Sequence, residues 1–238
     1  MSDPVILEVE DGIATLTLNR PDDRNALSAE MSGAILDAID ELEGTDDARC
    51  LVVQGTEGTF CAGGDVNAMI ELMSGAAELH EAVERIQHET HRAIRRVAEF
   101  HLPTVAKVDG VAFRQVGLGI DSGTSYLLPR QVGLSTAKEL VFTGEMLDAE
   151  AAADLGLFNH VYAEDFDEQC DEFIEQIAEG PTVALRHSKK LLEQGVTAGL
   201  KEALDNEAAA QAAVFETHDH EEGATAFMEG RDPEFEGR

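Results

Sequence analysis

Hydrophobic and polar residues alternate along the first stretch of the chain. Residues 5–10 and 13–19 both show this alternation, and Asp11-Gly12 separates them. An Asp-Gly pair readily takes up the backbone conformation of a two-residue hairpin turn, and alternation is typical of a half-buried strand. The pattern therefore predicts two antiparallel strands at the start of the chain.

The spacing of apolar residues changes to three and four after Ser28, which can cap a helix. One face of that helix would carry Met31, Ile35, Ala38, Ile39 and Leu42. An apolar run at 50–53 follows. The pattern predicts a helix between two strands.

A second stretch with helical spacing lies further along the chain, and its apolar stripe is expected to pack inward. The stripe consists of Leu79, Val83, Ile86, Thr90, Ile94 and Val97. Pro103 ends the pattern, and residues 104–108 are expected to form a buried strand that leads into the turn Asp109-Gly110.

The last third of the chain has helical patterns only, at 166–178, 183–192, 200–215 and 225–229. Strands separated by helices precede it. The chain is therefore expected to have an α/β fold followed by C-terminal helices.

A glycine-containing turn, Thr59-Phe60-Cys61-Ala62-Gly63-Gly64-Asp65, follows an apolar strand and opens a helix. Adjacent glycines let a ligand come close to the backbone, and the N–H groups of such a turn bind anions or polarised carbonyls. Asp65 is placed to cap the helix that continues through Leu72. By itself this is an ordinary strand-to-helix turn, and its meaning depends on the motifs around it.

These motifs occur in a fixed order over nearly the whole chain. They are Thr17-Leu18-Asn19-Arg20-Pro21-Asp22-Asp23-Arg24-Asn25-Ala26-Leu27-Ser28, the glycine turn, Leu102-Pro103-Thr104-Val105-Ala106-Lys107-Val108-Asp109-Gly110, Gly119-Ile120-Asp121-Ser122-Gly123-Thr124-Ser125-Tyr126-Leu127-Leu128-Pro129-Arg130, Thr143-Gly144-Glu145 and a segment at 149–161. In this order they resemble the enoyl-CoA hydratase/isomerase (crotonase) family.

The resemblance implies a crotonase-like spiral ββα core at 1–180 that carries an acyl-CoA site. It also implies a C-terminal helical region at 181–238 that builds a homotrimer or a homohexamer. The expected substrate is an acyl-CoA thioester, with coenzyme A as part of the substrate and no separate cofactor.

Composition narrows the functional classes. The chain has 238 residues and a formal charge of −31, which makes nucleic acid an improbable partner. There is no apolar run of the roughly 18 residues that a membrane span needs, and the N-terminus lacks a signal pattern, so we expect a cytoplasmic protein. The acids are dispersed, as on proteins from a high-salt cytoplasm, and we favour a halophile over a merely acidic mesophilic enzyme.

Other candidate chemistry is weaker. Three cysteines without a close pair indicate neither disulfides nor zinc, and Cys61 is interpreted as a packing residue. The glycines at 117, 119 and 123 are one residue too widely spaced for a dinucleotide fingerprint. Two histidine pairs, His88 with His91 and His218 with His220, lack a third ligand, so no metal site is expected.

One segment of the family pattern is missing. The family pattern has a segment here that is about twenty residues longer, roughly one strand and one helix. In its place this chain has only Phe113-Arg114-Gln115. In the family this part supplies the second N–H of the oxyanion hole, and only the donor at Gly64 is left. The two glutamates of hydratases are also not found, since one falls in the missing segment and the other at or near Phe113.

The resemblance leaves Asp121 as the best catalytic carboxylate, because isomerases of phenylacetyl-CoA ring epoxides and aryl-CoA dehalogenases carry an aspartate there. A plain helix cap for residues 122–128 is the competing interpretation of Asp121. Glu139 and Glu145 are interpreted as structural or surface acids.

The coenzyme A half of the substrate is expected to meet a different set of residues. The family's coenzyme A contacts map onto Arg24, Ala26, Ala62, Gly63 and Asp65, with Arg231 reaching the site of a neighbouring subunit.

Three functional hypotheses remain open. The first is double-bond isomerisation in an enoyl-CoA, with Gly64 polarising the thioester carbonyl and Asp121 moving a proton. The second is hydration of an enoyl-CoA in fatty-acid degradation, which needs a further acid or base. The third is an acyl-CoA-binding relative that has lost turnover together with the missing segment.

Overall fold

A four-stranded sheet in the order β1-β2-β3-β4 lies at the centre of the first half of the chain. The computed structural model describes residues 3–108, 111–112 and 120–238. The hairpin of β1 (Val5–Glu10) and β2 (Ile13–Leu18) forms as expected, with Asp11 and Gly12 both at positive φ. β3 (Cys50–Gly55) and β4 (Thr104–Ala106) then add in parallel.

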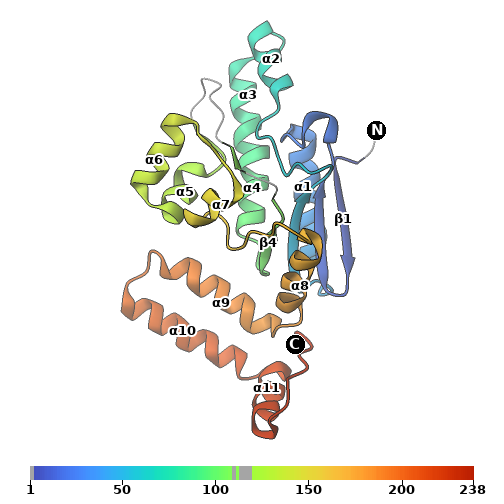
Figure 1. Ribbon diagram of the computed structural model, residues 1–238, viewed down its shortest axis with the longest axis vertical. Coiled ribbons are helices and arrows are strands. Elements are labelled where there is room, and N and C mark those ends of the chain that lie inside the picture. Colours follow the sequence, from blue (N-terminus) through green and yellow to red (C-terminus); the bar gives the residue numbers. More distant parts are fainter. Residues whose placement is uncertain (1–2, 109–110, 113–119) are drawn as a thin grey trace.

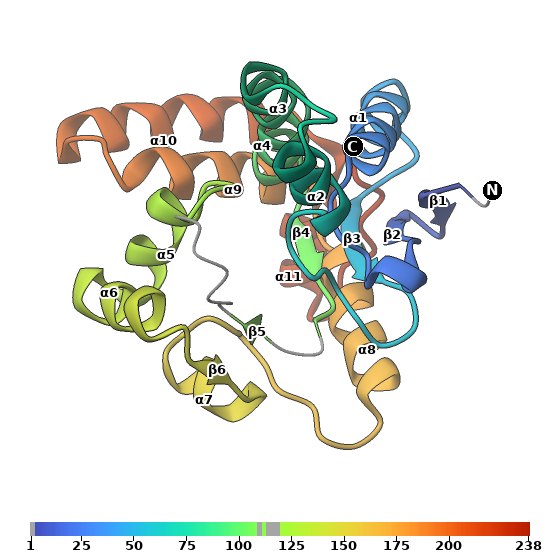
Figure 2. The same ribbon diagram turned by 90° about the horizontal axis from the view of Figure 1, so that it is seen from above.

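Helices cover both faces of this sheet (Figures 1 and 2). One face packs against α1 (Ala29–Glu43), which Ser28 caps by accepting a hydrogen bond from Met31 N, and against α4 (His91–Ala98). The other face packs against α8 (Phe166–Ala178). The expected apolar face of α1 is confirmed, since Met31, Ile35, Ala38, Ile39 and Leu42 are all buried.

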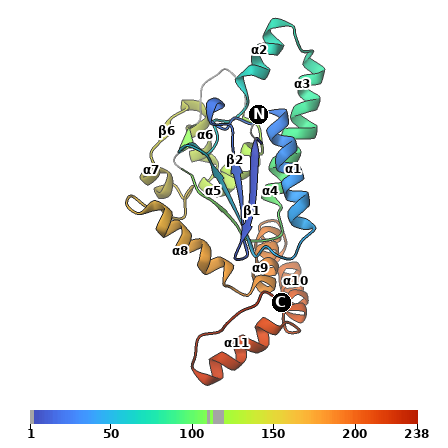
Figure 3. The same ribbon diagram turned by 90° about the vertical axis from the view of Figure 1, so that its right-hand side faces the viewer.

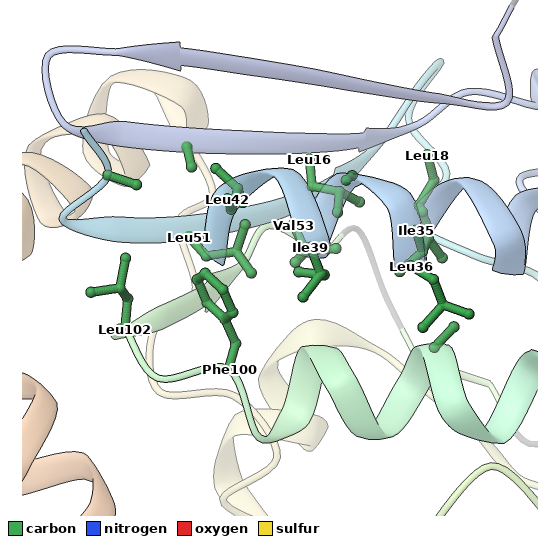
Figure 4. Packing of buried hydrophobic residues seen from close by; sticks show 14 of the residues in the cluster. Leu16, Leu18, Ile35, Leu36, Ile39, Leu42, Leu51, Val53, Phe100 and Leu102 are labelled. Carbon is green, nitrogen blue, oxygen red and sulfur yellow. The ribbon is translucent and has the colours of Figure 1, made fainter. Parts of the chain in front are cut away.

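The main core lies between α1, the sheet and the end of α4 (Figure 4). Leu16 of β2 and Leu51 of β3 are fully buried there, and Phe100, just after α4, closes the cluster. Lys189 fixes α9 to the same corner, because its Nζ donates to the carbonyls of Phe100 at 2.6 Å and Leu102 at 2.9 Å.

The second helical stretch forms, but only the later part of its apolar stripe packs inward. The long helical stretch is divided into α3 (Leu79–Arg85), a π-helical turn η2 (Ile86–Thr90) and α4. Leu79, Val83 and Ile86 are exposed, because α2 (Val66–Ser74) and α3 extend beyond the end of the sheet (Figure 1). The buried stripe begins only at Ala93.

The strand after Pro103 is also shorter and less buried than expected. It ends at Ala106, and both Thr104 and Ala106 are exposed. β4 is the edge strand of the described sheet, so part of it lacks a covering neighbour. The Asp109-Gly110 turn lies outside the described residues.

A separate small cluster follows. It packs α5 (Thr124–Val132), α6 (Leu134–Thr143) and α7 (Ala149–Asp154) around Leu128, Ala137 and Leu140, beside a two-stranded sheet of β5 (Val111–Ala112) and β6 (Met146–Leu147). The helices of the last third are confirmed as α9 (Thr182–Gly195), α10 (Leu200–Val214) and α11 (His218–Glu229). α11 starts earlier than expected because Thr217 caps it at His220 N.

The end of the chain turns back from α11 toward the sheet (Figure 3). The buried carboxylate of Asp219 accepts hydrogen bonds from Glu236 N and Gly237 N, and Arg49 donates to the carbonyls of Gly180 and Phe235. These contacts tie the C-terminal tail both to α11 and to the start of β3.

Candidate functional site

The glycine turn pairs with the loop that precedes α1. Leu27 forms a parallel bridge with Gly64, in which Leu27 N donates to Gly63 O at 2.8 Å and Asp65 N donates to Leu27 O at 3.3 Å. Ala62 N donates to Arg24 O at 3.0 Å. Two loops that are far apart in sequence therefore form one rigid unit at the carboxyl ends of β2 and β3.

Of the backbone N–H groups of residues 62–65, all except one have an acceptor among the described residues. Ala62 and Asp65 donate to backbone carbonyls, and Gly63 N lies 3.4 Å from the sulfur of Cys61. Among the described residues, the N–H of Gly64 has no acceptor, and Gly64 is exposed. It is therefore the donor that the turn offers to a ligand oxygen. The positive φ of Gly63, 95°, makes this turn possible without side-chain strain.

Asp65 has the structural role expected from sequence. It caps α2 by accepting a hydrogen bond from Asn67 N at 2.8 Å, and its second oxygen accepts one from Arg20 at 3.0 Å. Both oxygens of this carboxylate are thus engaged inside the protein. A direct contact of Asp65 with coenzyme A remains a prediction.

Two residues that the sequence analysis did not single out hold the loop at 20–27 in place. Arg20 also donates to Ala26 O at 2.9 Å and pairs with Asp23. Asn25 is fully buried at positive φ, and its amide donates to Thr56 O and Thr59 O. A polar residue in a loop gives little signal of burial, but Asn tolerates positive φ and bonds to nearby backbone, which explains its use here.

The predicted coenzyme A residues on this unit differ in their exposure and in their hydrogen bonds. Arg24 is exposed, and no hydrogen bond or ion pair of its side chain occurs within the described part of the chain. Ala62 and Gly63 are also exposed. Ala26 is buried, and its carbonyl already accepts from Arg20. The structure therefore brings Arg24 together with the Gly64 turn and leaves its cation free.

Arg231 lies apart from this unit, at the end of α11 (Figure 1). Its guanidinium binds both oxygens of Glu222, at 2.6 and 2.9 Å, and also pairs with Glu229. The hydrogen bond from Arg231 lowers the pKa of Glu222 to about 2. Within its own chain Arg231 holds the tail, and a role in a neighbouring site remains a prediction.

Asp121 does not cap a helix, so that interpretation is wrong. α5 begins at Thr124 with Gly123 as its N-cap residue, and no side chain caps it. The backbone carbonyl of Asp121 accepts from Thr124 N at 2.9 Å, whereas its exposed carboxylate has no hydrogen-bond partner among the described residues. No described contact joins Asp121 to Gly64. The positions of Phe113 and of the glycines at 117 and 119 lie outside the described residues.

Three cysteines and two further acids complete the residues considered in the sequence. Cys50, Cys61 and Cys170 are free thiols, and Cys61 packs against the main core while burial raises its pKa, which disfavours a nucleophile. Glu139 and Glu145 are exposed. In the described part of the chain, no three His, Cys, Asp or Glu residues gather as a possible metal site, and no helix there is long and apolar enough to cross a membrane.

Comparison with known proteins assigns the family. Two family models, both described as Enoyl-CoA hydratase/isomerase, match residues 13–113 and 110–238. The chain belongs to the enoyl-CoA hydratase/isomerase family. It is 30% identical to the mitochondrial methylglutaconyl-CoA hydratase of Mus musculus, over 95% of this chain and 80% of that protein. The family acts on acyl-CoA thioesters, so the expected substrate class is confirmed at this level.

Two further relatives extend this result. The chain is 29% identical to 1,2-epoxyphenylacetyl-CoA isomerase of Escherichia coli K12, over the full length of both proteins. The crystal structure of an enoyl-CoA hydratase/isomerase from Cupriavidus metallidurans CH34 superposes with a TM-score of 0.87 at 27% identity, covering 99% of this chain and 97% of that one. The crotonase-like fold expected from the sequence is confirmed.

Proposed function

We propose that this member of the family is an enoyl-CoA double-bond isomerase. The Gly64 N–H would hold the thioester oxygen, which stabilises the enolate formed when a proton leaves the α-carbon. Asp121 would take this proton and return one to the γ-carbon, so that the double bond moves and no atom is gained or lost. The observation that carries the proposal is the exposed N–H of Gly64, the one N–H from 62 to 65 without an acceptor among the described residues.

The free carboxylate of Asp121 favours isomerisation over hydration. Isomerisation needs one carboxylate that accepts and returns a proton, whereas hydration normally uses a pair. Asp121 is exposed and neither caps α5 nor forms an ion pair in the described ranges. The Escherichia coli relative that aligns over its full length is named an isomerase, which also favours isomerisation over hydration.

We also propose that the segment with the second oxyanion donor is shortened. The alignment with the Escherichia coli isomerase spans 265 positions, whereas this chain has 238 residues. Some positions of that relative therefore have no counterpart here. With one donor fewer, the rate would be lower by about a hundred- to a thousand-fold than in an enzyme with two donors.

Binding of acetoacetyl-CoA to a pair of variants at Gly64 tests the thioester site. Gly64→Pro removes the free N–H, while Gly64→Ala keeps it and serves as the matched control. Calorimetric titration should show binding by the wild type and by Gly64→Ala, and affinity weaker by up to about tenfold for Gly64→Pro, the loss expected for one hydrogen bond. Equal affinities for both variants would remove Gly64 from the site, and no binding by the wild type at millimolar ligand would refute the proposed function.

A further inference from the structure

Glu89 is a partly buried acid that the proposed reaction does not use. Its Oε2 is buried and has no hydrogen-bond partner among the described residues. Leaving such an oxygen unsatisfied costs about 1 to 3 kcal/mol, so native proteins rarely keep one without compensation. Glu89 also lies in η2, the π-helical turn, and such turns occur frequently at functional sites.

A second unpartnered group lies on the helix that faces Glu89. Ser32 of α1 is fully buried, and its Oγ also lacks a hydrogen-bond partner in the part of the chain that the structure describes. α1 packs against both η2 and α4.

The ion pair at the far end of this contact shows how the two helices are aligned. Arg96 of α4 donates to Asp40 of α1 at 2.7 Å. One layer before that pair, Leu36 and Ala93 both belong to the main core, and Figure 4 shows Leu36 pointing from α1 toward α4. Ser32 lies four residues before Leu36, and Glu89 lies four residues before Ala93. Because α1 also contacts η2, the two orphaned groups lie at about the same level of this contact.

This level is next to the glycine turn. Ser32 N donates to Ser28 O at 2.9 Å, so Ser32 is one helical turn from the residue that caps α1. Leu27, adjacent to Ser28, forms the bridge with Gly64. Anything that fixes the first turn of α1 against η2 therefore also fixes Leu27, whose bridge orients Gly64.

We propose that Glu89 and Ser32 bind one buried water molecule between α1 and η2, and that Glu89 is thereby a positioning residue for Gly64. A water can donate to the Glu89 carboxylate and accept from the Ser32 hydroxyl, which satisfies both orphaned oxygens. The part that concerns Gly64 rests on the proposed function. The water site itself does not.

A thermal double-mutant cycle tests the water site without any assay of activity. Ser32→Ala should lower the unfolding midpoint in the wild type and leave it unchanged in the Glu89→Leu background, because the water is already lost there. Equal lowering in both backgrounds would overturn the proposal. Glu89→Gln keeps hydrogen-bonding atoms, so in this background Ser32→Ala should again lower the midpoint.

Two ligands test the positioning role. Acetoacetyl-CoA has a thioester carbonyl for Gly64, whereas free coenzyme A has none. Glu89→Leu should weaken the binding of acetoacetyl-CoA by about tenfold or more, because a misplaced N–H donor forms a poorer hydrogen bond with the thioester oxygen. The affinity for coenzyme A should stay unchanged. Arg96→Gln, which breaks the same helix contact at its other end, should change neither affinity.

The outcomes separate the two proposals. Unchanged binding of acetoacetyl-CoA by Glu89→Leu would overturn the positioning role. Equal weakening of both ligands would also overturn it, because it would indicate general damage. Failure of the wild type to bind either ligand would refute the proposed function and with it the positioning role, while the thermal cycle would still decide whether the water site exists.

Discussion

Arg24 is an exposed cation in a protein with a formal charge of −31. A backbone hydrogen bond joins it to the glycine turn. Its carbonyl accepts from Ala62, which fixes its backbone, while its guanidinium is not engaged within the described residues. An acidic surface repels the phosphates of coenzyme A, so a local cation gains importance. Because its backbone is fixed and its side chain is exposed, Arg24 is suited to bind an anionic ligand.

We predict that Arg24→Glu weakens acyl-CoA binding by about tenfold or more, since a charge-assisted hydrogen bond is replaced by repulsion. Arg92→Glu on α4 makes the same change of charge at another exposed position and is the control. Fluorescence or calorimetric titration of both variants at one salt concentration measures the difference. If the two variants bind equally well, the phosphate role of Arg24 is wrong.

At the scale of elements, the end of α11 and the tail after it are joined by charge. Glu222 accepts from both terminal nitrogens of Arg231, and it also accepts from Glu234 N at 2.9 Å. This arrangement holds the pKa of Glu222 well below the ordinary value of 4.5. A carboxylate with a lowered pKa contributes stability above its unfolded pKa, and the contribution is lost as the pH falls through the folded pKa.

We therefore predict that Glu222 titrates near pH 2 in the wild type and at a clearly higher pH in Arg231→Gln, where only the hydrogen bond from Glu234 N still lowers its pKa. Carbon NMR of the glutamate carboxyl groups follows this titration directly. The contact of Glu234 with α11 should weaken as Glu222 becomes protonated, while Asp219 still holds the tail at Glu236 and Gly237. A wild-type midpoint near the ordinary value would show that Arg231 does not hold Glu222 in solution.

The local elements were largely predictable, and the exceptions have physical causes. Period-two alternation with Asp11-Gly12 predicts the first hairpin, and Ser28 with a 3.6-residue spacing predicts α1. The spacing continues through η2, however, and does not reveal that Leu79 and Val83 extend beyond the sheet. The spacing of apolar residues predicts which side chains share a helix face. Whether that face is buried depends on tertiary contacts that the spacing does not reveal.

The site was predictable only in part for the same reason. The glycine turn and the cap at Asp65 depend on adjacent residues and were found from the sequence. The support from Arg20 and Asn25 joins segments more than thirty residues apart and gives no local signal. Capping by Asp121 was excluded only by the start of α5 at Thr124, because Gly123 takes the N-cap position.

For the whole molecule, charge is the dominant feature. Acidic residues number 48 against 17 basic ones, and many of the ion pairs that form are exposed. Exposed pairs contribute little, and repulsion among the remaining carboxylates opposes folding at low ionic strength. Salt at molar concentration reduces the screening length to about 3 Å and removes most of this repulsion.

We predict that the thermal midpoint rises steadily with potassium chloride up to molar concentration, and that assembly into a trimer or hexamer follows the same trend. Circular dichroism and light scattering over a salt series measure both. A midpoint independent of salt would refute the proposed halophilic adaptation. A monomer at high salt would count against the trimer.

The most direct measurement of the proposed function compares wild type and Asp121→Asn in two assays, double-bond migration in a 3-enoyl-CoA and water addition to a 2-enoyl-CoA. The amide keeps the size of the side chain but cannot accept a proton. The isomerisation rate should therefore fall by about a hundred-fold or more with little change in affinity, and the wild type should isomerise faster than it hydrates. Equal isomerisation rates for the two proteins would contradict the role of Asp121, faster hydration would reverse the assignment, and tight binding without turnover would identify a catalytically silent relative.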